Sequence, residues 1–166
     1  LFCGINTDGV CDISGSKITA DASGYSEISL LLYAQDHFTV TDSDIKSVNV
    51  VFGETEGSDD NGCTIVDSTV ESTSPGGADM FKSSYADPGL QSKGGLSVKN
   101  STVNINTYGL EAVYCKGGDI IIDSSTVSAI SLLSDYVALN NDISGILCRN
   151  GNIVIKDSTV NAAGFE

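Results

Sequence analysis

Short stretches of this chain alternate apolar and polar residues, and Gly, Asn and Ser separate one stretch from the next. The pattern is clearest over residues 94–116, which read GGLSVKNSTVNINTYGLEAVYCK and contain three such runs. Alternation with a period of two predicts half-buried strands, and the separating residues predict tight corners between them. One unit of this kind cannot bury its apolar face alone, so its presence indicates a repeated structure.

Six copies of the unit follow one another when the chain is aligned on the serine that precedes the second strand. In every copy the positions five before, three before and two after the serine are apolar, which predicts three columns lining one interior. The residue before the serine is Gly, Asp, Asn or Ser, which predicts a corner where the serines form a hydrogen-bonded ladder. The six serines, at spacings of 27, 25, 33, 24 and 33 residues, are Ser16, Ser43, Ser68, Ser101, Ser125 and Ser158.

This repeat predicts an all-β fold, a single-stranded right-handed parallel β-helix (solenoid) of about six coils of ~24 residues. The two 33-residue spacings predict two loop insertions, within segments 72–91 and 130–145. Residues 1–166 are expected to form a single β-helix domain. The last residues, 164–166, match the start of the third strand in another unit, so the chain is expected to be a fragment of a longer solenoid or to associate end to end through its last coil.

Charge narrows the range of partners, because 22 acidic residues face 8 basic ones and give a net charge of −14. This balance opposes binding to nucleic acid, which requires clustered Lys and Arg. No apolar run approaches the ~18 residues of a membrane-spanning helix, so no membrane insertion is expected. The acids are concentrated in residues 1–92, where 15 acidic residues face 3 basic ones, whereas residues 93–166 contain 7 and 5.

Five cysteines and a single histidine, His37, limit the possible metal and redox chemistry. Cys115 and Cys148 each precede a repeat serine by ten residues, which predicts that they stack in consecutive coils as a buried ladder of reduced thiols. Cys11 and Cys63 share another column but lie two coils apart, ~9.6 Å, too far for a disulfide. No zinc site is expected, and His37 is expected at the surface.

Calcium is the cofactor that the acidic residues make worth considering, because carboxylate oxygens are its preferred ligands. One candidate group combines Asp8 and Asp12, and an acidic corner supplies the second: Glu54, Glu56, Asp59 and Asp60. A solvated acidic loop is the alternative reading of that corner. For a glycan ligand, exposed aromatic rings near the loop corner are the candidates: Tyr85, Tyr108 and Tyr136. An outward row of threonines offers hydroxyl groups to a sugar or to ice, or simply suits an exposed strand.

Three segments carry a resemblance to a known family: LSVKNSTVNI at 96–105, IIIDSSTVSA at 120–129 and IVIKDSTVNA at 153–162. They resemble the right-handed β-helix repeats of large bacterial cell-surface proteins, often described as adhesin-like or carbohydrate-binding. The resemblance implies a secreted or cell-surface protein that binds a glycan or another protein without catalysis. The same architecture also hosts pectate-lyase-like enzymes, in which Asp residues bind calcium and an Arg or Lys takes the proton. A polysaccharide-degrading lyase or glycosidase is therefore the alternative, with Arg149, Asp119 and Asp123 as its candidates.

Overall fold

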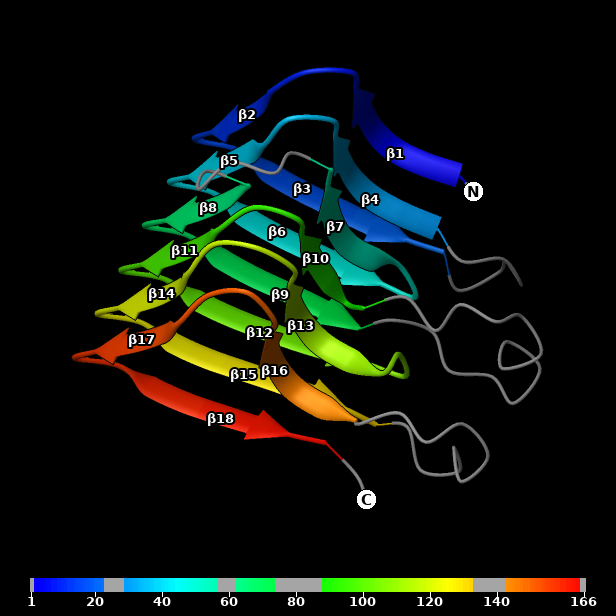
Figure 1. The fold of residues 1–166 in the computed structure, drawn as a ribbon. Coiled ribbons are helices and arrows are strands. Elements are labelled where there is room, and N and C mark those ends of the chain that lie inside the picture. Colours follow the sequence, from blue (N-terminus) through cyan, green and yellow to red (C-terminus); the bar gives the residue numbers. More distant parts are fainter. Residues whose placement is uncertain (1, 23–28, 57–61, 74–87, 133–142, 165–166) are drawn as a thin grey trace.

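A computed structural model describes residues 2–22, 29–56, 62–73, 88–132 and 143–164 of the chain. These residues form 18 β-strands and no helix, so the all-β prediction is confirmed. Consequently this part of the chain contains no helix with the length and apolarity to cross a membrane. The strands are stacked as successive windings of one chain, as Figure 1 shows.

The strands belong to three parallel sheets, each six strands wide, and each strand pairs with the strand three places away in the chain. The β1 sheet contains β1 (Phe2–Thr7), β4 (Ser29–Ala34), β7 (Val51–Thr55), β10 (Leu90–Ser92), β13 (Glu111–Cys115) and β16 (Ser144–Cys148). The β2 sheet contains β2 (Cys11–Ser14), β5 (Phe38–Thr41), β8 (Cys63–Val66), β11 (Leu96–Lys99), β14 (Ile120–Asp123) and β17 (Ile153–Lys156). The β3 sheet contains β3 (Lys17–Asp21), β6 (Asp44–Val48), β9 (Thr69–Thr73), β12 (Thr102–Thr107), β15 (Thr126–Ser131) and β18 (Thr159–Ala163).

This topology is that of a parallel β-helix, in which a coil is a run of three consecutive strands, one in each sheet (Figure 1). The register confirms the predicted columns, since Val103 pairs with Val70 on one side and with Val127 on the other. The right-handed winding stays a prediction.

Apolar side chains from all three sheets meet in a continuous core. At one level Phe38 from β5 fills space that a side chain at position 53 of β7 would otherwise occupy. A Cβ atom at Gly53 would lie 2.9 Å from two ring carbons of Phe38. The Phe38 ring also meets that of Phe52 edge to face, with 5.8 Å between the ring centroids. The ring of Phe38 therefore occupies the space that the missing side chain of Gly53 leaves.

The corner between the β2 sheet and the β3 sheet is always two residues long, and its second residue is the repeat serine. Its first residue has a positive φ in every copy, between 47° and 56°, a region that Gly, Asn and Asp enter most readily. Five serine hydroxyls accept a hydrogen bond from the backbone N–H of the serine one coil earlier, at 3.0–3.1 Å. The predicted serine ladder is confirmed.

The predicted stacking of the two cysteines is confirmed, because Cys115 pairs with Cys148 in the neighbouring strand. Both are free cysteines in the structure. Cys115 is fully buried and Cys148 only partly so, which corrects the expectation that both are buried. Burial raises the pKa of Cys115 to about 11, and the neighbouring Cys148 adds to the effect. Cys11 and Cys63 are separated by Phe38 in their shared column, as predicted.

The two predicted insertions lie between β9 and β10 and between β15 and β16, and most of their residues are outside the described part of the chain. The predicted acidic corner is wrong at its first residue. Glu54 belongs to strand β7, where it pairs with Tyr33 and Gln91 in the neighbouring strands of the β1 sheet. The corner between β7 and β8 starts only after Thr55.

Candidate binding face

The outer face of the β1 sheet carries two neighbouring rows of side chains, which we call together the polar face. The first row is defined by strand register, and its members are exposed or half-buried. It contains, in stacking order, Asn6, Tyr33, Glu54, Gln91, Tyr114 and Leu147. Two tyrosines therefore flank a carboxylate and an amide on four consecutive strands.

The second row lies just beyond the ends of the same strands, where backbone hydrogen bonds continue the ladder past the last paired residue. Lys93, Lys116 and Arg149 each donate their N–H to the preceding coil in this way, at 2.8–3.3 Å. In stacking order this row contains Asp8, Gln35, Glu56, Lys93, Lys116 and Arg149. Its charge thus changes along the solenoid, from acidic in the earlier coils to basic in the later ones.

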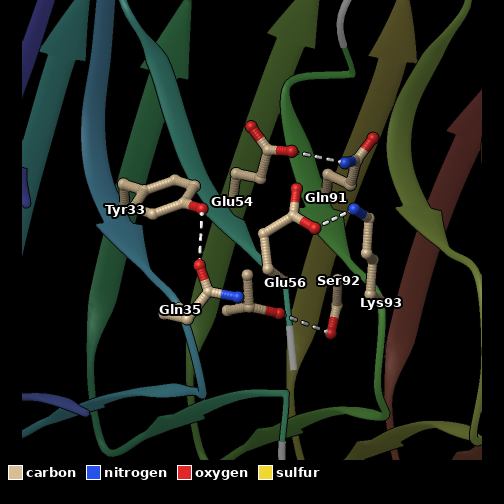
Figure 2. Close-up of polar contacts among 8 residues, drawn as sticks. Tyr33, Gln35, Glu54, Glu56, Gln91, Ser92 and Lys93 are labelled. Carbon is tan, nitrogen blue, oxygen red and sulfur yellow. Dashed lines mark hydrogen bonds and ion pairs between the residues drawn. The ribbon is translucent and has the colours of Figure 1, made fainter. Parts of the chain in front are cut away.

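Hydrogen bonds between strands hold several of these side chains in place, as Figure 2 shows. The Gln91 amide donates from Nε2 to Glu54 Oε1 at 2.7 Å, and the Lys93 ammonium donates to Glu56 Oε2. Within one coil, the Tyr33 hydroxyl donates to Gln35 Oε1 at 3.1 Å. These contacts restrict the rotamers of the polar face, so its hydrogen-bonding groups are largely preorganised.

A buried hydroxyl pair supports the same strands from within the solenoid. Thr55 Oγ1 and Ser92 Oγ are 3.3 Å apart, and Ser92 also donates to the carbonyl of Gly95 at 2.9 Å. Thr55, Ser92 and Cys115 occupy successive places in one inward column. Small polar residues in that column leave room for close packing at the corner, where a Cβ on Gly62 would lie 2.2 Å from Ser92 Oγ.

An aromatic and cationic group occupies the end of the polar face nearest the C-terminal strand. The guanidinium carbon of Arg149 lies 5.8 Å from the centroid of the Tyr114 ring, which is the geometry of a cation–π contact. On the same strand as Tyr114, Glu111 is buried, and burial raises its pKa while the charge of Arg149 opposes that shift.

Of the three tyrosines predicted from the sequence, only Tyr108 lies within the described part of the chain. It follows β12 at the corner toward β13 and is 39% exposed, away from the two rows of the polar face. Tyr85 and Tyr136 lie outside the described residues. The predicted aromatic row at the loop corner stays a prediction.

The calcium candidates are divided among separate places. Asp8 and Asp12 are both exposed, and they lie on either side of the corner between β1 and β2. Glu54 and Glu56 lie two coils away from Asp8 along the polar face, and they are bonded to Gln91 and Lys93, respectively. Within the described ranges no group of three or more His, Cys, Asp or Glu residues is close enough to hold a metal ion. Two further candidates lie outside those ranges: Asp59 and Asp60.

The candidates for a polysaccharide-degrading enzyme occupy different corners. Asp119 immediately precedes β14 and Asp123 ends it, so their Cα atoms are ~13 Å apart along an extended strand. Asp119 Oδ1 accepts bonds from the backbone and the side-chain amide of Asn152 at 2.8 and 3.0 Å. Asp123 accepts from the Ser124 hydroxyl at 2.9 Å. Arg149 lies beside Tyr114 on the β1 sheet, whereas β14 belongs to the β2 sheet.

The predicted threonine row is present on the outer face of the β3 sheet, where it occupies consecutive strands. Its four exposed members are Thr69, Thr102, Thr126 and Thr159. In the preceding strands the row continues with Lys17 and Asp44, which form an exposed ion pair at 3.5 Å. His37 is half-buried at the corner before β5.

Sequence reasoning missed most of the polar face, including Tyr33, Gln91 and Tyr114. The available signal was the alternation within the third strand of each unit, which places Tyr33 and Tyr114 on the face opposite the core. Comparison of the chain with models of protein families, with curated protein sequences and with solved structures found no match. The geometry of the polar face is therefore the basis for a functional proposal.

Proposed function

We propose that this chain is a non-catalytic module of a secreted or cell-surface protein and that its polar face binds a glycan. The observation that supports this proposal is the first row of that face, in which Tyr33, Glu54, Gln91 and Tyr114 stand on consecutive strands. Tyrosine rings offer apolar surface with a polar tip, and carboxylate and amide groups offer acceptors and donors for sugar hydroxyls.

The spacing of the row suits an extended ligand. Neighbouring strands are ~4.8 Å apart, so Tyr33 and Tyr114 are separated by ~14 Å along the solenoid. A short oligosaccharide laid along the axis could contact both rings and the Glu54–Gln91 pair between them. Because these side chains project from sheet strands, which are more rigid than loops, little ordering is needed on binding.

A lyase or glycosidase is the weaker proposal. Paired carboxylates of glycosidases are ~5–10 Å apart, whereas the backbone positions of Asp119 and Asp123 are ~13 Å apart at opposite ends of a strand. Calcium is the cofactor that the screen below includes, since Glu54 and Glu56 lie on the polar face and sugar hydroxyls are oxygen ligands that complete a calcium coordination shell. The hydrogen bonds of the polar face are explained without catalysis and without calcium.

A glycan-array screen with and without calcium tests the proposal, followed by titration of the best ligands with variants. Tyr33→Ala and Gln91→Ala should each weaken binding at least fivefold, because each removes one of the four consecutive side chains proposed to contact the glycan. Tyr108→Ala is the matched control, since Tyr108 is an exposed tyrosine outside the polar face. Binding that is lost with Tyr108→Ala and kept with Tyr33→Ala would contradict the proposal, as would release of unsaturated or reducing sugars from the ligand.

A further inference from the structure

The later part of the second row of the polar face has a charge opposite to that of the chain as a whole. The whole chain has 22 acidic and 8 basic residues, yet three of those basic residues stand on consecutive coils of this row. They are Lys93, Lys116 and Arg149, whose backbone N–H groups bond to Thr55, Ser92 and Cys115 in the strands before them. Stacking like charges at ~4.8 Å is unfavourable unless a partner of opposite charge compensates for it.

Only one of the three cations has such a partner among the described residues. Lys93 is paired with Glu56, and both side chains are less than one-third exposed. Lys116 and Arg149 are exposed and form no ion pair with a described carboxylate. Two cations on adjacent coils therefore remain open to solvent at the end of the polar face.

The two nearest acids in the described part of the chain, Asp119 and Glu111, do not neutralise these cations by direct contact. Asp119, in the corner after Lys116, is held by two hydrogen bonds from Asn152. Glu111 is only 8% exposed, and its charge interacts with Arg149 without forming an ion pair. Tyr114 restricts the guanidinium group from one side, and Asn150 donates to the carbonyl of Lys116 at 2.8 Å, which fixes the corner between them.

We infer that the ligand of the polar face is an acidic glycan and that its carboxylate or sulfate groups bind Arg149 and Lys116. The guanidinium offers a planar pair of N–H donors to such an oxyanion, and the ammonium offers a second charge one coil away. Anionic groups repeated along an oligosaccharide would relieve the repulsion within the basic part of the row. This inference rests on the proposed function, because it assigns a chemical class to the ligand of the same face.

Calorimetric titration of the purified chain with four probes tests both ideas. The probes are an oligouronate, the same oligosaccharide with its carboxylates reduced to alcohols, a sulfated oligosaccharide, and polyacrylate as an anion without sugar. We expect the oligouronate or the sulfated oligosaccharide to bind at least tenfold more tightly than the reduced one, with an affinity that falls as ionic strength rises. Which of the two binds more tightly identifies the anionic group.

Substitutions of single charged residues test where the anionic groups of the probe bind. Arg149→Gln and Lys116→Gln should each weaken binding of the acidic probe at least fivefold and affect the reduced probe by a clearly smaller factor. Lys99→Gln is the matched control, because Lys99 is an exposed cation at the end of β11 in the β2 sheet. Glu56→Gln should strengthen binding at least twofold, since it releases Lys93 from its partner and extends the open cations to three.

The outcomes separate the two proposals. Equal affinity for the acidic and the reduced oligosaccharide would overturn the acidic class and leave glycan binding intact. Equal affinity for polyacrylate and the oligouronate, abolished by Arg149→Gln, would keep the anion site and overturn glycan recognition. Loss of acidic binding with Lys99→Gln instead of Arg149→Gln would overturn the location of the site, and no binding of any probe would overturn both proposals.

Discussion

Replacing Ser101 by Ala tests whether the serine ladder holds successive coils together. Ser101 Oγ donates to the carbonyl of Lys99 at 2.6 Å and accepts the backbone N–H of Ser68, one coil earlier, at 3.1 Å. After the substitution the Lys99 carbonyl still accepts the N–H of Asp67 at 3.0 Å. The N–H of Ser68 loses its acceptor, and both serines are about 5% exposed, so little water can replace it.

A buried donor without a partner costs about 1–3 kcal/mol of folding free energy, and we expect Ser101→Ala to reduce the free energy of unfolding by this amount. The chain supplies its own control at the first place in the column. Ser16 Oγ donates to Ser14 at 2.8 Å, as Ser101 does to Lys99, but it accepts no inter-coil hydrogen bond within the described residues. Ser16→Ala should therefore change the free energy by no more than ~0.5 kcal/mol.

Urea denaturation followed by far-UV circular dichroism measures this difference. Ser101→Ala should lower the urea midpoint with an unchanged slope, and its melting temperature should fall about 2–4 °C for each kcal/mol lost. Equal effects of Ser101→Ala and Ser16→Ala would refute the reasoning, because the inter-coil hydrogen bond would then contribute nothing. A changed slope would show that the substitution breaks the cooperativity between coils instead.

Three other substitutions test the core. Gly53→Ala should cost about 1–3 kcal/mol, because the new Cβ would meet the buried Phe38 ring, and Phe38→Leu in the same chain should recover part of the loss in urea melts. Ser47→Ala should stabilise the protein by up to ~1 kcal/mol, since Ser47 Oγ is buried without a hydrogen-bond partner among the described residues. In the native state the pKa of the Cys115 thiol is about 11, against 9.0 for a free thiol. Between these two pH values the unfolded chain loses the thiol proton and the native state keeps it, so stability should fall as the pH rises from about 9 to about 11. Cys115→Ser should reduce that fall, whereas an unchanged pH profile would assign it to other groups.

The sequence was sufficient to predict two of the three sheets in detail. The corner between the β2 sheet and the β3 sheet is two residues long in every coil, so a register set at the serine extends without error into both flanking strands. Apolar columns through Val103 and Ile122 follow from that register alone. The corner residue is also constrained, because only a few residue types adopt its positive φ readily.

The β1 sheet could not be predicted in the same way, because its corner with the β2 sheet varies in length. Three residues separate β10 from β11, four separate β13 from β14, and seven separate β7 from β8. Gln91 and Cys115 each stand ten residues before a repeat serine, so a fixed count predicts that they pair. In the structure Ser92 pairs with Cys115 instead. An error of one residue exchanges the inner and outer faces of a strand.

This difference between the corners bears on where a binding surface can develop. The corner between the β2 and β3 sheets has a fixed length, so the outer side chains of these sheets keep a fixed position relative to the core columns. An insertion at this corner would disrupt the serine ladder. The corner after the β1 sheet tolerates insertions, since the coils with three, four and seven residues keep their strands in register. Side chains just past these strands, such as Glu56, Lys93 and Arg149, can therefore change in type and reach without disturbing the core. The polar face lies beside a corner of variable length, whereas the threonine row of the β3 sheet directly follows the corner of fixed length. This difference is the physical reason why a binding surface is better placed on the polar face than on the threonine row.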